Sequence, residues 1–247
     1  MYKFMAIIGC FLALSSHAQV STTLSAAQIL ANADSFRASQ SGTLSSTRVE
    51  AFDGERKIKE RRYHVYSMPP ARSLVVFQHG SERGQKLLMR GNDYWIFMPN
   101  SKRPIRITPL QRVVGEAAIG DIATLSWAEH YRATISGKRI INQRECIELE
   151  LVATASGLSY SRIELSVDAQ GYWPVAAKLY LQSGKLAKVA QFRIDNSSSP
   201  AHLSAMELRD AITPSKHTLL HYEQRQQQDI PEKFFNPAYL AQATLTL

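Results

Sequence analysis

The run Tyr94-Trp95-Ile96-Phe97-Met98 places five apolar residues in a row. Gly91-Asn92-Asp93 before it and Pro99-Asn100-Ser101 after it favour chain reversals, so the run is predicted as a strand. An antiparallel strand with one face in water alternates apolar and polar side chains, and this run does not. Both of its faces should therefore be covered. One would face the main core or an apolar ligand cavity, and the other a helix, a loop or a partner.

Other stretches show the alternation and the turns of antiparallel strands. In Glu145–Leu151 and Arg162–Asp168 every second residue is apolar, which predicts strands with one face in water. Thr43–Phe52 and Glu55–Met68 are joined at Asp53-Gly54, a dipeptide typical of tight hairpins. Over the whole chain the pattern predicts about ten or eleven strands and two or three helices. The fold class is therefore mainly β (α+β), with a single antiparallel sheet.

One amphipathic helix is expected ahead of the strands. Ser25 and Gln28 have the spacing of a capping box. An apolar stripe then recurs at helical spacing and predicts packing on the sheet. Its residues are Ala26, Ile29, Leu30, Ala33 and Phe36. The polar face is predicted to carry Asn32, Asp34 and Arg37 rather than a lysine stripe, which disfavours membrane attachment.

Residues 1–18 have the pattern of a cleavable secretory signal. Phe4–Leu14 is an apolar stretch too short to span a bilayer, and Ser16-His17-Ala18 is a small-x-small cleavage site. An alternative interpretation is a lipoprotein signal with Cys10 as the lipidated residue. After cleavage, 19–247 would form one domain, and its length suffices for one sizeable core.

Charge and cysteine content narrow the function classes. The net charge of +8 could indicate nucleic acid, but an exported chain without a recognition motif argues for acidic partners, anionic membrane surfaces or simple solubility. Removal of Cys10 leaves Cys146 alone, so no internal disulfide is expected. The basic stretch Arg56–Arg62 is interpreted as protection of an exposed sheet surface, with docking of an acidic partner as the alternative.

The sequence has little that indicates catalysis. It contains no nucleophile elbow, phosphate-binding loop, dinucleotide fingerprint or zinc-protease motif. Cys146 shares a predicted strand face with Glu148 and Glu150, which would raise its pKa and disfavour a nucleophile. His217 and His221 suit a metal pair on a helix, but their segment is predicted as a strand. We therefore expect no enzyme activity, no cofactor and no metal.

The stretch from Leu87 to Asp121 carries a family resemblance. Its glycine turn, its aromatic strand ending in Met98-Pro99, the basic strand at Lys102–Ile107 and the Gln111-Arg112 pair resemble the LolA/LolB-like superfamily. They most resemble its uncharacterised outer-membrane lipoprotein-sorting-type members. A weaker likeness covers most of the remaining chain, including Phe234–Leu240.

The resemblance implies a strongly curved, unclosed β-barrel whose concave face is covered by helices. It also implies a periplasmic carrier that shields the acyl chains of a lipoprotein or lipid on the way to the outer membrane. An inner-membrane transporter or an outer-membrane acceptor would be its partner, and we expect a monomer. In the best-studied relatives an early arginine holds the cover closed. Arg48, Arg61 and Arg62 are candidates here, and none is assigned that role.

Candidate binding residues follow from this reading. The cavity lining is predicted to comprise Leu74, Val76, Leu88, Trp95, Phe97, Ile163, Leu165, Leu179 and Leu181. Each could equally be a core residue. Arg103, Arg106 and Arg112 are candidates for an anionic head group or an acidic partner, because arginine suits phosphate and carboxylate. Val113–Trp127, glycine-flanked and apolar, is the most lid-like segment.

Three functions remain open at this stage. The first is a lipid or lipoprotein carrier, and the second is a lipid-responsive sensor or an accessory protein of a lipid exporter that does not transfer its ligand. The third is an enzyme, which would need a cluster of catalytic groups that the sequence does not display.

Overall fold

The computed structural model describes residues 24–38, 41–91, 93–107, 126–197 and 199–243. The predicted signal, Cys10, Arg112 and most of Val113–Trp127 lie outside these ranges. In the described ranges, no helix combines the length and the apolar character needed to cross a membrane.

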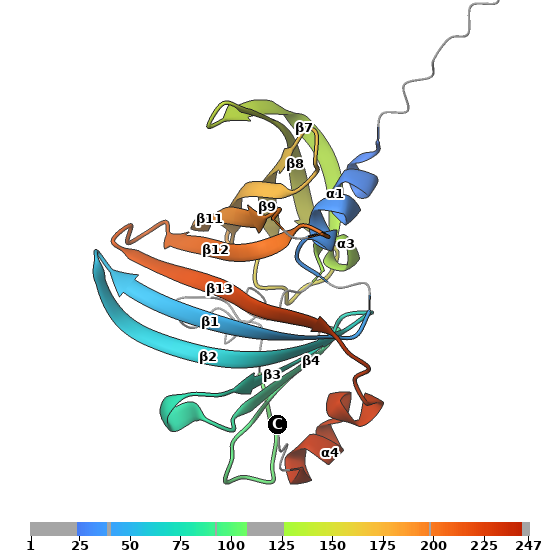
Figure 1. Cartoon of the computed structure of the whole chain (residues 1–247), viewed down its shortest axis with the longest axis vertical. Coiled ribbons are helices and arrows are strands. Elements are labelled where there is room, and N and C mark those ends of the chain that lie inside the picture. The colour runs from blue at the N-terminus through green and yellow to red at the C-terminus, as the bar shows by residue number, and fades with distance from the viewer. Residues whose placement is uncertain (1–23, 39–40, 92, 108–125, 198, 244–247) are drawn as a thin grey trace, which may run out of the picture.

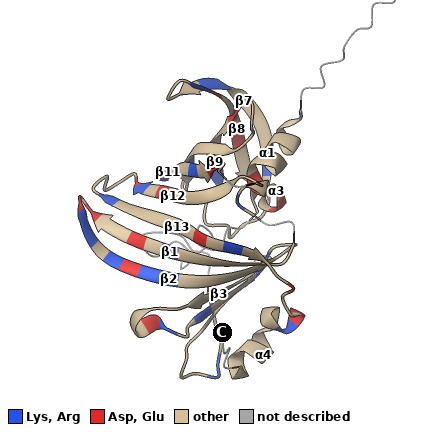
Figure 2. Ribbon diagram, in the orientation of Figure 1, with Lys and Arg blue, Asp and Glu red and all other residues tan. Residues whose placement is uncertain are grey.

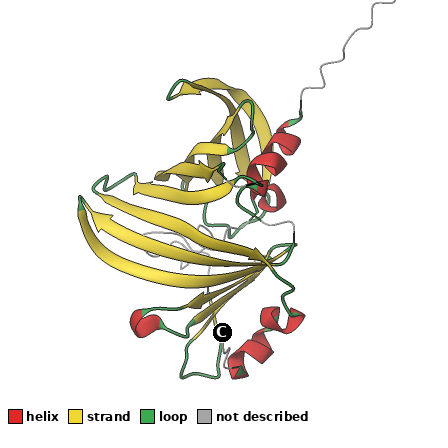
Figure 3. Cartoon of the chain, in the orientation of Figure 1, coloured by secondary structure: helices red, strands yellow, loops and turns green. Residues whose placement is uncertain are grey.

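The structure is built mainly from strands, with short helices at their margins (Figures 1 and 3). The helical elements are α1 (Ala26–Ser35), η1 (Gly80–Glu82), α3 (Trp127–His130), η3 (Glu232–Phe235) and α4 (Pro237–Gln242). The strands are β1 (Thr43–Asp53), β2 (Arg56–Met68), β3 (Arg72–Phe77), β4 (Lys86–Arg90), β5 (Asp93–Phe97), β6 (Ile105–Arg106), β7 (Tyr131–Ile141), β8 (Arg144–Ala153), β9 (Arg162–Asp168), β10 (Pro174–Tyr180), β11 (Leu186–Asp195), β12 (His202–Asp210) and β13 (Lys216–Gln227).

All thirteen strands form one antiparallel sheet in the order β6-β5-β4-β3-β2-β1-β13-β12-β11-β10-β9-β8-β7. The sheet is strongly curved and is not closed into a barrel (Figure 1). Because of this curvature, elements far apart in the strand order come into contact. The backbone N–H of Ala71, between β2 and β3, donates to Glu129 Oε2 of α3 at 2.8 Å. Since α3 leads directly into β7 at one edge of the sheet, it spans the open side toward the opposite end.

The hairpin predicted at Asp53-Gly54 is present and starts this sheet. Gly54 has φ of +60°, a conformation that residues with a side chain rarely adopt, and Arg56 begins β2 immediately beyond the turn. β1 then pairs with β2 on one side and with β13 on the other. The N-terminal hairpin and the C-terminal strands therefore meet in the middle of the sheet.

The two faces of the sheet carry different apolar clusters. We call the face covered by α1 and α3 the inner face, and its cluster extends from β5 to β8. We call the opposite face the outer face. Its smaller cluster lies under η3 and α4, over β2 to β5.

The prediction that Tyr94–Met98 is covered on both faces is confirmed for Tyr94–Phe97, whereas Met98 lies past the end of β5 and is exposed. Tyr94 and Ile96 pack in the inner cluster, whereas Trp95 and Phe97 pack in the outer cluster. The cover on the outer side is the C-terminal helical segment.

The strand count differs from the prediction, because the sheet has thirteen strands rather than about ten or eleven. The two edge strands are the hardest to recognise from sequence. The predicted basic strand Lys102–Ile107 reduces to the two residues of β6. β7 shows little apolar alternation because most of its residues are exposed on both faces.

A buried lysine fixes α4 to the outer face. Lys86 on β4 is only 8% exposed, and its Nζ donates to the carbonyl oxygens of Leu240 (2.9 Å) and Ala243 (2.6 Å). These carbonyls belong to the end of α4, where helical C=O groups lack partners within the helix. Arg72 supports the other end of the segment through Glu232, with Nη1 to Oε1 at 2.6 Å.

We predict that Lys86→Met loosens the C-terminal segment. Methionine keeps the apolar stem but cannot donate to the two carbonyls, so the free energy of unfolding should fall by about 1–3 kcal/mol. Urea unfolding measures the loss, and hydrogen exchange should locate it in α4. Lys59→Met, at an exposed lysine of β2, is the control and should leave stability unchanged. Equal stability of both variants would contradict this anchoring role.

Candidate functional site

The inner face carries a large apolar cluster with a helical cover, interrupted by a few buried polar side chains such as Thr47 and Lys188. α1 contributes Ile29, Leu30 and Ala33 to the cluster, and α3 contributes Trp127, whose ring meets Phe192 of β11 edge-on at 5.7 Å. The strands supply the floor in alternate positions, as pleated strands do. Two short helices therefore cover part of a sheet face that is apolar over most of its strands.

A buried carboxylate joins the two covering helices. Asp34 of α1 is 3% exposed, and its Oδ2 accepts hydrogen bonds from Ser126 Oγ (2.5 Å) and Ala128 N (3.2 Å) at the start of α3. Its Oδ1 accepts from Arg37 Nη1 at 3.2 Å. The guanidinium of Arg37 stacks on the ring of Trp127, 3.5 Å from its centroid. We call Asp34, Arg37, Ser126 and Trp127 the Asp34 latch.

The latch corrects one sequence prediction. Asp34 and Arg37 were expected on the polar face of α1, but both are buried. The capping box at Ser25 and Gln28 and the apolar stripe are confirmed. Asp34 lies four residues after Leu30 and therefore on the same side of the helix. This spacing was the one sequence feature that pointed to its burial. Burial became evident only with its partner Ser126, 92 residues later.

α3 also positions a buried histidine next to the latch. His130 is 8% exposed, and its Nε2 has no hydrogen-bond partner among the described residues. Its backbone carbonyl accepts from the N–H of Thr154 at 2.9 Å, which ties α3 to the end of β8. Burial lowers the pKa of His130, against the smaller opposing effects of Glu129 and Asp34.

The nine predicted lining residues do not form one group, since they divide between the two faces. Ile163, Leu165, Leu179 and Leu181 belong to the inner face, where all but the last are buried. The other five belong to the outer cluster beneath η3 and α4. These are Leu74, Val76, Leu88, Trp95 and Phe97.

The predicted arginines lie away from the inner cluster or outside the described ranges. Arg106 pairs with Trp95 across β5 and β6, which places it on the outer face, and it forms an ion pair with Asp93. Arg103 is exposed in the turn before β6. Arg112 is not among the described residues.

The three early arginines considered as latches for the cover pair with glutamates outside the covering helices. Arg48 contacts Glu223 through Nε at 2.6 Å, and Arg61 contacts Glu82 through Nε at 2.6 Å. Arg62 lies 3.4 Å from Glu60. In the described structure the arginine that contacts both covering helices is Arg37, which sequence reasoning did not select.

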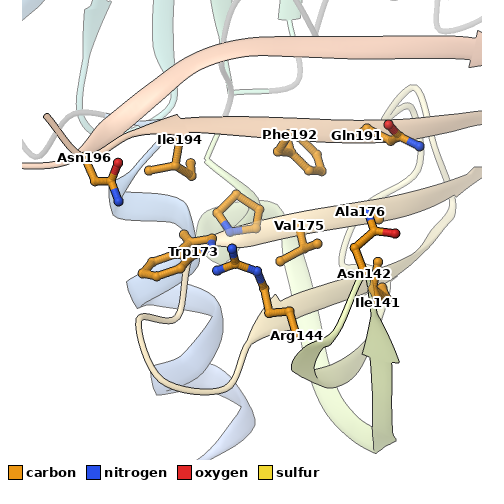
Figure 4. A pocket seen from close by; sticks show the side chains of 11 residues that line it. Ile141, Asn142, Arg144, Trp173, Val175, Ala176, Gln191, Phe192, Ile194 and Asn196 are labelled. Atoms are coloured by element: carbon orange, nitrogen blue, oxygen red, sulfur yellow. The ribbon is translucent and has the colours of Figure 1, made fainter.

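A cavity of about 300 Å³ opens beside the inner cluster and was not predicted (Figure 4). The walls come from the β7–β8 turn, the start of β10 and the end of β11. The lining includes Asn142, Arg144, Trp173, Val175, Phe192 and Ile194. We call it the rim cavity. Phe192 lines the rim cavity and also packs against Trp127, so it is shared by the cavity and the covered inner face.

Arginine chemistry dominates the polar side of the rim cavity. Arg144 Nη1 contacts Asp168 Oδ2 at 3.0 Å, and its guanidinium lies 5.1 Å from the ring centroid of Trp173. Asp168 Oδ1 accepts from the N–H groups of Gln170 and Gly171, so this carboxylate is fully engaged. The lining mixes polar side chains, among them Asn142, Gln191 and Asn196, with apolar ones such as Val175 and Ile194, and more of its exposed surface is polar than apolar.

The remaining sequence candidates show no catalytic arrangement. Cys146 is 1% exposed, and its pKa is raised by burial first and then by Asp168 and Glu148, which disfavours a thiolate. His217 and His221 lie on β13, a strand as predicted. Within the described ranges, no three His, Cys, Asp or Glu side chains are grouped to hold a metal ion.

The basic β1–β2 hairpin carries carboxylates among its cations (Figure 2). Lys57 Nζ contacts Glu50 at 3.1 Å and Glu60 at 2.8 Å, and Arg48 contacts Glu50 at 2.8 Å. This mutual pairing favours the interpretation of a solvated sheet surface over that of a docking site for an acidic partner.

Comparison with known structures confirms the resemblance to the LolA/LolB-like superfamily. A LolA superfamily protein from Nitrosomonas europaea is 28% identical, with a TM-score of 0.80 over 87% of this chain and 98% of that one. A Vibrio parahaemolyticus domain named for outer membrane lipoprotein sorting is 18% identical, with a TM-score of 0.73 over 88% and 98%. At this lower identity the second similarity shows the fold alone.

A family model described as "Uncharacterized protein" matches residues 70–242. The match covers more than half of the chain, so the chain belongs to this family. No curated protein matches the sequence.

We predict that Asp34→Ala releases α1 from α3. The substitution removes a buried carboxylate beside the Arg37 guanidinium, a change that typically costs about 3–5 kcal/mol. Thermal or urea unfolding measures the loss, and hydrogen exchange should rise in α1 and α3. Glu223→Ala removes the exposed partner of Arg48 and should cost less than about 1 kcal/mol. A similar small effect at both positions would argue against the latch.

We predict that His130 makes the cover sensitive to acid. Its pKa is lower in the folded protein than the unfolded value of about 6.5, so the unfolded state binds protons first. The stability that neutral His130 provides is complete above that pH and is lost as the pH falls through the folded pKa. His130→Leu should flatten the fall in unfolding free energy below pH 7, and His79→Leu, at an exposed site, should not. An unchanged slope in His130→Leu would contradict the assignment.

Proposed function

We propose that this protein is an exported carrier whose inner face shields the acyl chains of a lipid or lipoprotein. The observation that carries the proposal is the apolar inner face of an unclosed sheet, covered by two short helices that a single buried carboxylate joins. The similarity to a LolA superfamily protein over most of both chains supports it. Residues 1–18 would direct export, and the periplasm would be the working compartment.

The energetics favour such a host. Each methylene removed from water contributes about 0.8 kcal/mol, so an acyl chain with about ten buried methylenes gains about 8 kcal/mol. A ligand that displaced the cover would have to offset the Asp34 latch and also the apolar contacts that Ile29, Leu30 and Trp127 make with the sheet. We propose that an acyl chain competes with α1 and α3 for the same apolar floor.

The four inner-face candidates, Ile163, Leu165, Leu179 and Leu181, would contact the chain. The rim cavity would receive the polar end, because its lining is largely polar and Arg144 offers guanidinium donors there. Phe192 would lie at the boundary between the two parts. A membrane transporter or acceptor would load and unload the carrier.

A sensor or exporter accessory that holds lipid without transferring it is the second candidate. It would bind lipid on the same inner face. The two candidates therefore differ only in whether the bound lipid is transferred to a membrane. Adding acceptor membranes distinguishes the two, since a carrier would release its lipid to them and a sensor would not. In either case we propose binding rather than catalysis. Burial first, and then Asp168 and Glu148, raise the pKa of Cys146, which disfavours this thiol as a nucleophile.

The three tryptophans provide a direct test, because each reports a different place. Trp127 lies over the inner face, Trp95 under α4 on the outer face, and Trp173 in the rim cavity. Trp95→Phe with Trp173→Phe leaves Trp127 as the only emitter. We predict that a fatty acid brominated along its chain quenches this emission by more than half at saturation, because bromine quenches on contact.

The matched control keeps Trp95 alone through Trp127→Phe and Trp173→Phe. It should bind the same fatty acid with little quenching, since the sheet separates Trp95 from the inner face. Strong quenching of Trp95 with none of Trp127 would move the site to the outer face. No uptake of fatty acid by either protein would contradict the carrier.

A further inference from the structure

β7 is an edge strand of eleven residues that α1 contacts over part of its length, and it suggests a second binding surface. It ends the sheet on the side opposite β6, which has only two residues. Every residue from Thr134 to Ile140 is exposed. A long edge with free backbone groups is a template for pairing with another strand, and proteins usually shorten or cover such edges. The edge at β6 is short, whereas that at β7 is long.

The pairing register identifies the backbone groups that point outward. The N–H of Ala153 donates to Ser161, toward β9, whereas the N–H of Thr154 donates to His130, at the start of β7. Because direction alternates along an antiparallel strand, the β7 residues opposite Ala153, Leu151 and Leu149 direct their groups away from β8. Ala133 and Ile135 are two of these.

A bulge between Ile135 and Gly137 resets the alternation. Beyond it, the carbonyl of Glu145 accepts from Ala169 on the β9 side, so Ile140, which is opposite Glu145, also points outward. Lys138, two residues earlier, shares its direction. The free edge thus offers N–H and C=O groups on both sides of the bulge.

The side chains of this edge are cationic on one face and partly apolar on the other. Arg132 and Arg139 lie on the outer face, opposite Val152 and Cys146. Ile135 and Ile140 lie on the inner face and are 52% and 72% exposed. Lys138 is on the inner face as well. β7 contains no Asp or Glu.

These cations differ from those of the β1–β2 hairpin. Arg132, Lys138 and Arg139 form no ion pair with any described carboxylate, whereas Lys57 contacts two. On β8, Glu150 and Glu148 stand on the same outer face opposite Thr134 and Gly137, one strand in from the edge, and Glu150 lies 3.5 Å from Arg162. Glu145 stands opposite Ile140 on the inner face. The charged side chains of the outermost strand itself are all positive (Figure 2, blue on β7).

We propose that the β7 edge binds an extended segment of another protein in which acidic and apolar residues alternate. A strand added at this edge would lie about 4.8 Å away and place alternate side chains on the two faces. Its acidic side chains would meet Arg132 and Arg139, and its apolar side chains would meet Ile135 and Ile140. A second copy of β7 would bring three more cations into the same positions, which disfavours self-pairing.

The test uses a fluorescent twelve-residue peptide of alternating glutamate and valine, and measures its anisotropy with the purified protein. A peptide with lysine in place of glutamate is the charge control. We expect saturable binding of the acidic peptide, weakened by added salt, and no binding of the basic one. Absent binding of the acidic peptide, or equal binding of both, overturns the proposal.

Two variants test the strand geometry and the charge. Ile140→Pro removes an outward N–H, which costs β7 no bond to β8, and should weaken binding about tenfold relative to Ile140→Ala. Arg132→Glu with Arg139→Glu should abolish binding of the acidic peptide and permit the basic one. Unchanged affinity in both variants would exclude β7 as the site.

Two control measurements separate this proposal from the carrier function and from self-association. Brominated fatty acid should quench Trp127 equally in these variants, so a failure of this proposal is distinguishable from a failure of the carrier function. Light scattering reports self-pairing. A dimer that the acidic peptide does not dissociate, and that Ile140→Pro disrupts, would overturn the proposal in favour of a second copy at the edge.

Discussion

The structure depends on one constraint: an antiparallel sheet that is apolar across its inner face and does not close on itself needs a cover. A closed barrel would fill its interior with its own side chains, but thirteen strands left open expose the floor along one side. α1 and α3 supply the described part of that cover. The buried carboxylate of Asp34 holds the two together, so a single charged group links helices that are distant in sequence.

The outer face of the sheet is mostly polar. Its middle is charged and solvated, with Arg48, Glu50 and Lys57 forming mutual ion pairs. Its one apolar region, over β2 to β5, is covered by η3 and α4, which Lys86 fixes through main-chain carbonyls. The two covers thus differ in kind: the C-terminal one closes a small cluster, whereas the N-terminal one lies on the largest apolar surface of the described molecule.

Much of the fold was predictable from sequence, because local rules determine it. The absence of alternation in Tyr94–Met98 indicated two covered faces, and both covers are present. Ser25 with Gln28 identified the start of α1, and Gly54 the first hairpin. The binding residues were less predictable. Leu74 and Leu165 are both buried and apolar, and their assignment to opposite faces depends on the order of all thirteen strands.

The polar groups of the site were the least predictable. The sequence pattern assigns Asp34 to the polar face of its helix, and only the contacts with Ser126 and Ala128 show that it is buried. The rim cavity combines three separate segments around Arg144 and Trp173, and no local pattern connects them. Arg106, chosen for its motif, lies on the outer face because β6 pairs with β5 in that register.

The most direct test of the central claim is native mass spectrometry of the protein recovered from a bacterial periplasm, followed by organic extraction of whatever is bound. The account predicts a mass increment that matches an acylated species, which disappears on extraction and returns when fatty acid or phospholipid is added. A bare protein mass that stays unchanged with added lipid would contradict the claim that the inner face holds acyl chains.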